Sequence, residues 1–195
     1  MYWLFSSPGW SCARTSWSPQ IGDPTVTGWV IVATYLLCAF VALRVGQRSG
    51  FPPKTRRRER LFWFLTAALM LALGINKQMD LQSLLTEIGR CTAKAQGWYE
   101  QRRGFQREFI IWLGLATLGL GAVTGFALRH SLRRTGLALL GLMLVGGFVL
   151  IRAVGFHHLD GLIYQRISGM PVNGMLELSG LLLILWGGLR QLRRT

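Results

Sequence analysis

Five long apolar runs set the strongest limit on what this chain can fold into. They cover residues 24–43, 61–80, 109–128, 137–153 and 172–189. Each run is close to the roughly 20 residues that a helix needs to cross a bilayer. Each is also apolar around its whole circumference, whereas a transmembrane strand would alternate in polarity. We therefore predict an all-α integral membrane bundle of five transmembrane helices, in which the whole chain forms a single membrane domain.

The basic residues predict how this bundle lies in the membrane. The segments after the first, third and fifth runs hold most of the Lys and Arg residues and one acid, Glu59. By the positive-inside rule, this distribution predicts an exoplasmic amino terminus, with residues 1–23 as an exoplasmic tail, and a cytoplasmic carboxyl terminus. The excess of 22 Lys and Arg over 8 Asp and Glu then indicates contact with the lipid bilayer and not with nucleic acid. Residues 56–58, three arginines, are expected to anchor the topology and to meet anionic headgroups.

Residues 81–108 are expected to form an exoplasmic helical loop that continues the second transmembrane helix. Polar residues recur at helical spacing from the end of that helix into the loop, which places them on one face. These residues are Asn76, Asp80, Ser83 and Glu87. Further along, Tyr99 and Glu100 are expected to form a rim that meets a ligand or substrate.

Helical rise gives the depth of the polar residues in the predicted spans. At 1.5 Å per residue from the cytoplasmic arginines, Glu177 lies roughly 20 Å up, Asn76 roughly 24 Å, Arg152 roughly 27 Å and Asp80 roughly 30 Å. The hydrocarbon core is about 30 Å thick, so these groups share its outer part. Unpaired charges at that depth are costly, and residues that carry them usually have a function. We therefore predict a polar pocket on the exoplasmic side, in which Arg152 and Glu177 form an ion pair.

The residues expected to bind a ligand in this pocket come from three helices and the loop before the third span. They are Asn76, Lys77, Gln78, Tyr99, Glu100, Arg152 and Glu177.

Two histidines next to an aspartate, His157, His158 and Asp160, are expected at the upper lip of the pocket. Together with Asp80 they include the imidazole and carboxylate ligands that a divalent metal such as zinc or manganese accepts. A metal-bound hydroxide could then attack an ester or amide of a lipid. A metal-free alternative uses one histidine as general base, with Ser83 or Ser179 as nucleophile. The sequence contains no HExxH motif.

Three interpretations of the pocket therefore stay open, and the cofactor stays unknown. The first is a binding or accessory subunit of a membrane assembly, or a transporter, with other membrane subunits or further copies of the chain as partners. The second is a membrane-embedded hydrolase or transferase that acts on a lipid or lipid-linked substrate. The third is a set of polar residues that only fixes the register of the helices.

Several short motifs carry a resemblance to a known group. They are Ile21-Gly22-Asp23-Pro24, Asn76-Lys77-Gln78, Gly97-Trp98-Tyr99-Glu100, Phe156-His157-His158 and Leu176-Glu177-Leu178. In these motifs the chain resembles a group of small bacterial multi-pass membrane proteins that have no established activity. The resemblance covers about residues 21–177 and implies a bacterial inner-membrane location.

Small residues and cysteines complete the sequence predictions. Glycines in the third and fourth runs are expected to let helix backbones approach closely. They are Gly114, Gly119, Gly121, Gly125, Gly136, Gly141, Gly146 and Gly147. Cys12 and Cys91 share the predicted exoplasmic side, where a disulfide is chemically permissible, but we expect them to be unpaired.

Overall fold

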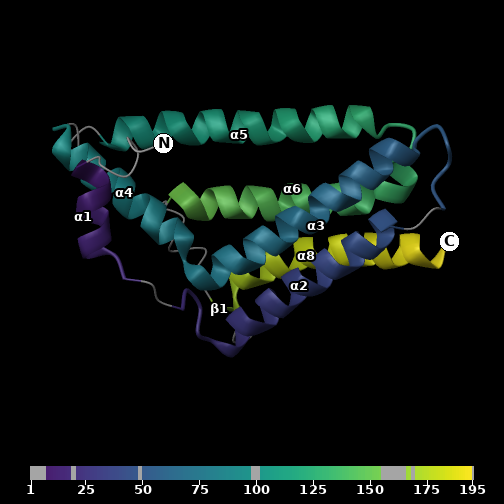
Figure 1. Cartoon of the computed structure of the whole chain (residues 1–195), viewed down its shortest axis with the longest axis horizontal. Coiled ribbons are helices and arrows are strands. Elements are labelled where there is room, and N and C mark those ends of the chain that lie inside the picture. The colour runs from purple at the N-terminus through teal and green to yellow at the C-terminus, as the bar shows by residue number, and fades with distance from the viewer. Residues whose placement is uncertain are drawn as a thin grey trace.

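The computed structural model describes residues 8–18, 21–47, 50–97, 102–154, 166–167 and 170–194. These residues form seven helices and one pair of two-residue strands (Figure 1). The helices are α1 (Pro8–Ser16), α2 (Val26–Gln47), α3 (Arg56–Met79), α4 (Leu81–Ala95), α5 (Arg102–Ala127), α6 (Leu132–Val154) and α8 (Val172–Arg193). The strands β1 (Arg166–Ile167) and β2 (Met170–Pro171) pair antiparallel directly before α8.

Four of the described helices, α2, α3, α6 and α8, are long and apolar enough to cross a membrane. The apolar section of α5, Ile111–Ala127, is shorter. The described residues thus confirm the all-helical architecture, and they contain four helices able to span a membrane where the sequence predicted five.

The helices also extend beyond the apolar runs. The predicted first span stops at residue 43, but α2 continues to Gln47, and α3 begins at Arg56 rather than at residue 61. Arginines satisfy the carbonyl groups that helix ends leave without an intrahelical partner. Arg60 Nε donates to the Gly46 carbonyl at 2.9 Å, and Arg58 Nη1 donates to the Ala127 carbonyl at 3.3 Å. Hydropathy alone does not detect these charged turns at the helix ends.

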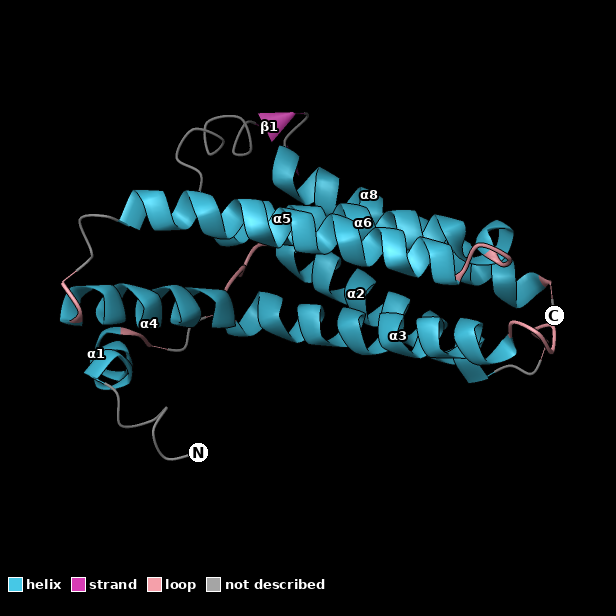
Figure 2. Ribbon diagram, turned by 90° about the horizontal axis from the view of Figure 1, so that it is seen from above, coloured by secondary structure: helices cyan, strands magenta, loops and turns pink. Residues whose placement is uncertain are grey.

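The long helices run side by side along the molecule (Figures 1 and 2). Helix α2 packs against α3 and α8, and α6 packs against α8 and α5. Buried apolar residues, among them Tyr35, Met70, Val145 and Leu181, form the core between α2, α3, α6 and α8. Many large apolar side chains face outward on these helices and on α5, including Leu65 of α3 and Leu118 of α5. Outward apolar faces of this extent are typical of helices that contact lipid.

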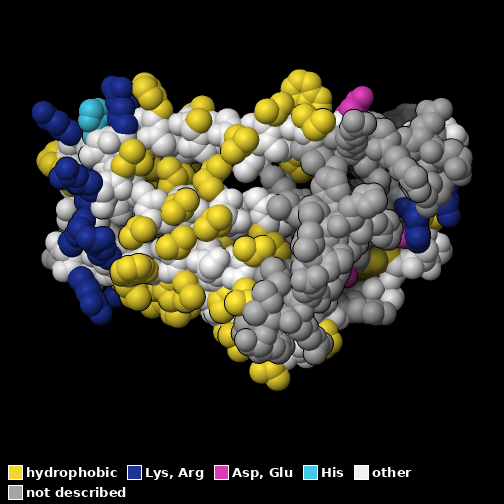
Figure 3. All heavy atoms as spheres, turned by 180° about the vertical axis from the view of Figure 1, so that it is seen from behind, with side chains coloured by type: hydrophobic (Ala, Val, Ile, Leu, Met, Phe, Trp, Pro, Cys, Tyr) yellow, Lys and Arg dark blue, Asp and Glu magenta, His cyan; other side chains and the backbone are white. Residues whose placement is uncertain are grey.

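One end of the bundle, which we call the basic end, carries most of the described cationic residues (Figure 3). It includes the connection around Lys54, the connection around Arg129 and the last turn of α8. Its one acid is fully buried: Glu59 Oε1 accepts from Arg134 Nη2 at 2.6 Å, and Glu59 Oε2 accepts from Arg134 Nε at 3.0 Å. This two-pronged ion pair joins α3 to α6.

The opposite end, which we call the α4 end, differs from the sequence prediction. Helix α3 does not continue through residues 81–108, because Asp80 adopts a left-handed backbone conformation, with φ of 45°, and α4 begins at Leu81 as a separate helix. Aspartate is one of the few residues other than glycine that visit this conformation readily.

The prediction of unpaired cysteines is also wrong, since a disulfide links Cys12 on α1 to Cys91 on α4.

Glycines bring α6 and α8 into backbone contact. A Cβ atom built on Gly141 would lie 2.5 Å from the Gly180 carbonyl oxygen, so no larger residue fits there without displacing a helix. The predicted packing role therefore holds for Gly141. By contrast, a Cβ on Gly114, Gly119 or Gly136 meets no atom within 4 Å.

Candidate functional site

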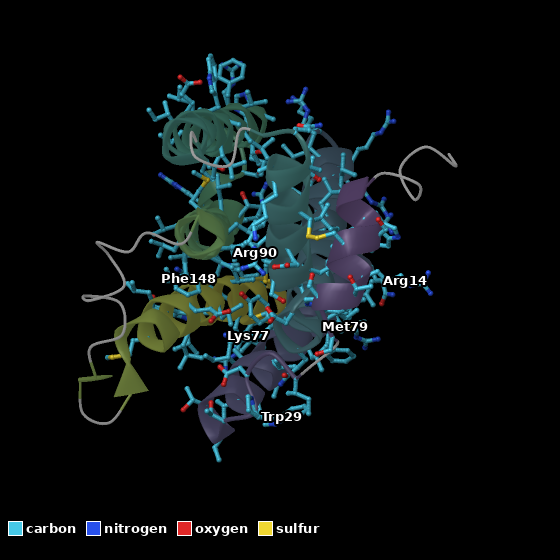
Figure 4. The ribbon with its side chains drawn as sticks, turned by 90° about the vertical axis from the view of Figure 1, so that its left-hand side faces the viewer. Arg14, Trp29, Lys77, Met79, Arg90 and Phe148 are labelled. Atoms are coloured by element: carbon cyan, nitrogen blue, oxygen red, sulfur yellow. A yellow bond between two sulfur atoms is a disulfide. The ribbon has the colours of Figure 1, made fainter. Side chains whose placement is uncertain are left out.

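The candidate site is centred on an ion pair between α3 and α8. Lys77 Nζ lies 2.7 Å from Glu177 Oε2, and the two side chains are only 6% and 4% exposed. Tyr35 on α2 donates its hydroxyl hydrogen to Glu177 Oε1 at 2.9 Å. Both carboxylate oxygens of Glu177 are therefore engaged by groups from two other helices. In Figure 4, Lys77 lies beside the ribbon of α8 near the α4 end.

The segment before α2 supplies a second carboxylate. Asp23 Oδ2 is 4.0 Å from Lys77 Nζ, while Asp23 Oδ1 accepts from the Thr25 hydroxyl at 2.6 Å. The Gly22 amide donates to the Gln78 carbonyl at 2.9 Å, which ties this segment to the end of α3. A Cβ on Gly22 would lie 2.5 Å from the Lys77 carbonyl oxygen, so only glycine allows this approach. Lys77 Nζ therefore lies between two carboxylates, that of Glu177 at 2.7 Å and that of Asp23 at 4.0 Å.

A small cavity lies beside the ion pair. It is lined by Tyr35, Leu73, Asn76, Lys77, Asp80, Phe148, Val149 and Glu177. Its volume for the centre of a water-sized molecule is about 20 Å³. A single water needs about 10–15 Å³ by this measure, whereas pockets for organic ligands span about 300–1,000 Å³. In this conformation the cavity fits a water or a small ion and is too small for an organic substrate.

The structure brings together four residues that sequence reasoning assigned to one pocket: Asn76, Lys77, Asp80 and Glu177. Gln78 lies apart from them. It does not line the cavity, and its side-chain Oε1 and Nε2 are buried without a hydrogen-bond partner among the described residues. Helix geometry explains the difference, because Gln78 lies two positions from both Asn76 and Asp80, and residues two apart face different sides of a helix.

The predicted polar face from Asn76 to Glu87 is wrong. Because the chain turns at Asp80, Asn76 and Asp80 line the cavity, whereas Ser83 and Glu87 face α1. Ser83 Oγ accepts from Trp17 Nε1 at 2.9 Å, and Glu87 Oε1 accepts from Ser16 Oγ at 2.9 Å.

The structure gives Glu177 an ion-pair partner that the sequence analysis did not name. The sequence analysis paired Glu177 with Arg152, but Lys77 occupies that position in the structure. Lys77 and Arg152 lie at similar depths, and depth alone does not say which side chain points toward α8. Residue 152 lies in α6 and its side chain is outside the described residues, so a contact between Arg152 and Glu177 stays a prediction.

Several other predicted site residues lie outside the described residues. Tyr99 and Glu100 fall in the segment 98–101, and His157, His158 and Asp160 fall in the segment 155–165. Within the described part of the chain, no three His, Cys, Asp or Glu side chains converge as a metal site would require. The metal-dependent interpretation and its metal-free alternative stay predictions that depend on residues 155–165.

Sequence reasoning missed two members of the site, Tyr35 and Asp23. Tyr35 is the one tyrosine inside the first apolar run, and Asp23 directly precedes that run. A buried tyrosine hydroxyl usually has a hydrogen-bond partner. The position of Tyr35 inside the span therefore could have predicted that it contacts a polar residue of the site.

A separate polar cluster joins α1 to α4. The Arg90 guanidinium hydrogen-bonds to Glu87 and, together with the Ser16 hydroxyl, holds the pKa of the Glu87 carboxyl below its ordinary value. These contacts lie near the Cys12–Cys91 disulfide, which Figure 4 shows as a yellow bond between the two helices. The α1–α4 pair is therefore fixed both covalently and electrostatically.

Comparison with known proteins gives no relative on which to base an assignment: no family model, curated protein or solved structure matches the chain. The resemblance to small bacterial multi-pass membrane proteins accordingly stays a prediction. The function must be inferred from the site itself.

Proposed function

We propose that this chain is a binding or accessory subunit of a membrane assembly, and that the cluster around Lys77 and Glu177 is its functional centre. The observation that carries the proposal is the buried ion pair itself, which joins α3 to α8 and also engages Tyr35 of α2. Ionisable residues inside membrane-spanning bundles are expensive and usually serve a function. Stability alone is a weak reason to keep them, because replacing a buried pair with apolar residues is often neutral or stabilising.

The size of the cavity favours this role over catalysis on a lipid substrate. A volume of about 20 Å³ accommodates about one water, so the described site binds at most a water or a small ion. Helix α5 packs mainly against α6 and leaves large apolar side chains such as Trp112 and Phe126 exposed. An outer helix of this kind can contact lipid or a partner subunit.

For the membrane arrangement, we propose that α5 is the fifth span, with the α4 end exoplasmic and the basic end cytoplasmic in a bacterial inner membrane. At 1.5 Å per residue, the 26 residues of α5 extend about 39 Å, which exceeds the thickness of the hydrocarbon core. The basic end follows the positive-inside rule. A disulfide at the opposite end suits an oxidising compartment.

The test is native mass spectrometry of the full chain, extracted from its own membrane in lipid particles. We expect the wild type to retain a second polypeptide at fixed stoichiometry. The double variant Lys77→Met/Glu177→Leu should stay folded and lose that companion. A matched variant at the basic end, Glu59→Leu/Arg134→Met, should keep it. A wild-type protein with no companion, or a companion that survives in the Lys77/Glu177 variant, overturns the proposal.

A further inference from the structure

A second pocket lies at the basic end, on the outer side of the first turns of α3. This groove is lined by Pro53, Arg56, Arg57, Arg60, Leu61 and Phe64. Its volume is about 550 Å³, which falls within the range of about 300–1,000 Å³ typical of sites for organic ligands. The groove is therefore far larger than the cavity beside Lys77 and has a different composition.

The polar half of the groove is purely cationic. Arg56, Arg57 and Arg60 contribute three guanidinium groups, and none of the described residues that line the groove is acidic. The acid nearest in sequence, Glu59, is fully buried and bound by Arg134, so it does not neutralise them. Neither Arg56 nor Arg57 forms an ion pair with a described residue. The groove thus presents positive charge that the described protein leaves uncompensated.

Arg60 is held in position within this groove. Its Nε donates to the Gly46 carbonyl at 2.9 Å, and its guanidinium carbon lies 6.0 Å from the centre of the Phe64 ring. The two terminal amino groups, Nη1 and Nη2, have no acceptor among the described residues. A guanidinium fixed in this way can donate to a phosphate at a small entropic cost, and arginine is well suited to phosphate recognition.

The other half of the groove is apolar and continues toward the membrane interior. Leu61 and Leu65 are 57% and 61% exposed, and Phe64 is also exposed. Helical spacing aligns Arg56, Arg60 and Phe64 along one line, and Arg57, Leu61 and Leu65 along the neighbouring line. Both lines pass from charged to apolar within two turns. This polarity matches a molecule whose phosphate adjoins a hydrocarbon chain.

We propose that this groove binds an anionic phospholipid of the leaflet at the basic end. Arg56, Arg57 and Arg60 contact its phosphate, and one acyl chain lies along Leu61 and Phe64. A free phosphate would use only the arginines and leave the apolar half unoccupied. The positive-inside rule explains why arginines lie at this end, but it does not require a groove. The binding of one defined lipid is therefore a separate property of this surface. The proposal does not depend on the function of the Lys77–Glu177 cluster.

The test uses the full chain in nanodiscs made from phosphatidylcholine with a minor fraction of phosphatidylglycerol. Native mass spectrometry then counts the phosphatidylglycerol retained as the lipid is stripped. The groove variant is Arg56→Gln/Arg57→Gln. The matched control, Arg193→Gln/Arg194→Gln, removes equal charge from two exposed positions at the same end, the last residue of α8 and the residue after it. Since a basic residue near the surface is worth about 1 kcal/mol, the groove variant should bind phosphatidylglycerol roughly 30-fold more weakly.

A further variant separates a lipid from a free anion. Leu61→Ser keeps all three arginines and should still weaken the retention of phosphatidylglycerol. A thermal unfolding midpoint close to that of the wild type reports that each variant is folded. The proposal is overturned if the wild type retains phosphatidylcholine equally well, if both arginine variants lose phosphatidylglycerol equally, or if inorganic phosphate displaces the lipid and Leu61→Ser has no effect.

Discussion

Lys77 and Glu177 are 100 positions apart in the sequence, yet their charged atoms lie 2.7 Å apart between α3 and α8. Removing one partner leaves the other charge buried. We expect Glu177→Leu to lower the free energy of unfolding by about 3–5 kcal/mol, because Lys77 then keeps only Asp23 at 4.0 Å. Reversible unfolding in mixed micelles measures the loss.

The double variant Lys77→Met/Glu177→Leu completes a thermodynamic cycle for this pair. It should recover most of the lost stability, because it buries no unpaired charge. A double variant that loses the sum of the two single effects would show that the two side chains do not interact.

At the basic end, Arg134→Ala should be strongly destabilising. Glu59 is fully buried and would lose both hydrogen bonds from the guanidinium, which costs about 3 kcal/mol or more. The neighbouring Arg133 is exposed on the same helix, so Arg133→Ala should change the free energy of unfolding by about 0.5 kcal/mol or less. Equal losses in the two variants would contradict the structural role assigned to the Glu59–Arg134 pair.

The crossing of α6 and α8 predicts opposite effects for two glycine substitutions on α6. In Gly141→Ala the added methyl meets the Gly180 carbonyl oxygen at 2.5 Å, and a helix backbone cannot easily yield; we expect a loss of roughly 1–3 kcal/mol. In Gly136→Ala the methyl meets no atom within 4 Å, and the higher helix propensity of alanine should stabilise by up to about 1 kcal/mol. Thermal unfolding of both variants checks the pair, and a neutral Gly141→Ala would argue against this crossing.

The disulfide should control how firmly α1 is held. In Cys12→Ser/Cys91→Ser we expect hydrogen exchange of the α1 amides to speed up, by an amount equivalent to about 2–4 kcal/mol. Reduction of the wild type should reproduce this change, while the double variant should not respond to the reductant. Equal protection of α1 in all samples would mean that its contacts with α4 suffice without the covalent bond.

Acidification should weaken the contact between α1 and α4. The pKa of Glu87 is lowered below its ordinary value of 4.5, chiefly by Arg90 and then by Ser16, so the carboxylate stabilises the α1–α4 contact above that value. The contribution is lost as the pH falls through the lowered pKa. Exchange of the α1 and α4 amides, corrected for its intrinsic pH dependence, should rise in that range. Glu87→Gln should remove the dependence, and an unchanged profile in that variant would point to another group.

Much of the architecture followed from the sequence, because hydropathy reports directly on membrane depth. The apolar runs predicted α2, α3, α6 and α8, and helical rise placed Lys77, Asp80 and Glu177 at one level. Depth is a single coordinate, however. In helices that are apolar on all sides, the sequence carries little information about rotation, and so it could not choose between Lys77 and Arg152 as the partner of Glu177.

Other features depended on the path of the chain. The Cys12–Cys91 pair spans 79 positions and forms because α1 packs on α4, a contact that no local pattern encodes. The break at Asp80 was easier to foresee, since aspartate tolerates a left-handed conformation, but the apolar spacing on both sides concealed it. The burial of Glu59 could not be predicted from the sequence. It depends on how α6 approaches α3, and in the sequence Glu59 is simply one acid among arginines.

The disulfide between Cys12 and Cys91 also constrains how often the chain crosses the membrane. Together with the intervening backbone it closes a covalent ring that contains α2 and α3. A bond of this length cannot reach across the hydrocarbon core, so both sulfur atoms must lie on the same face of the bilayer. The number of crossings within the ring is therefore even. Helices α2 and α3 are both long and apolar enough to cross, and an arrangement in which only one of them traverses the bilayer is incompatible with the closed ring.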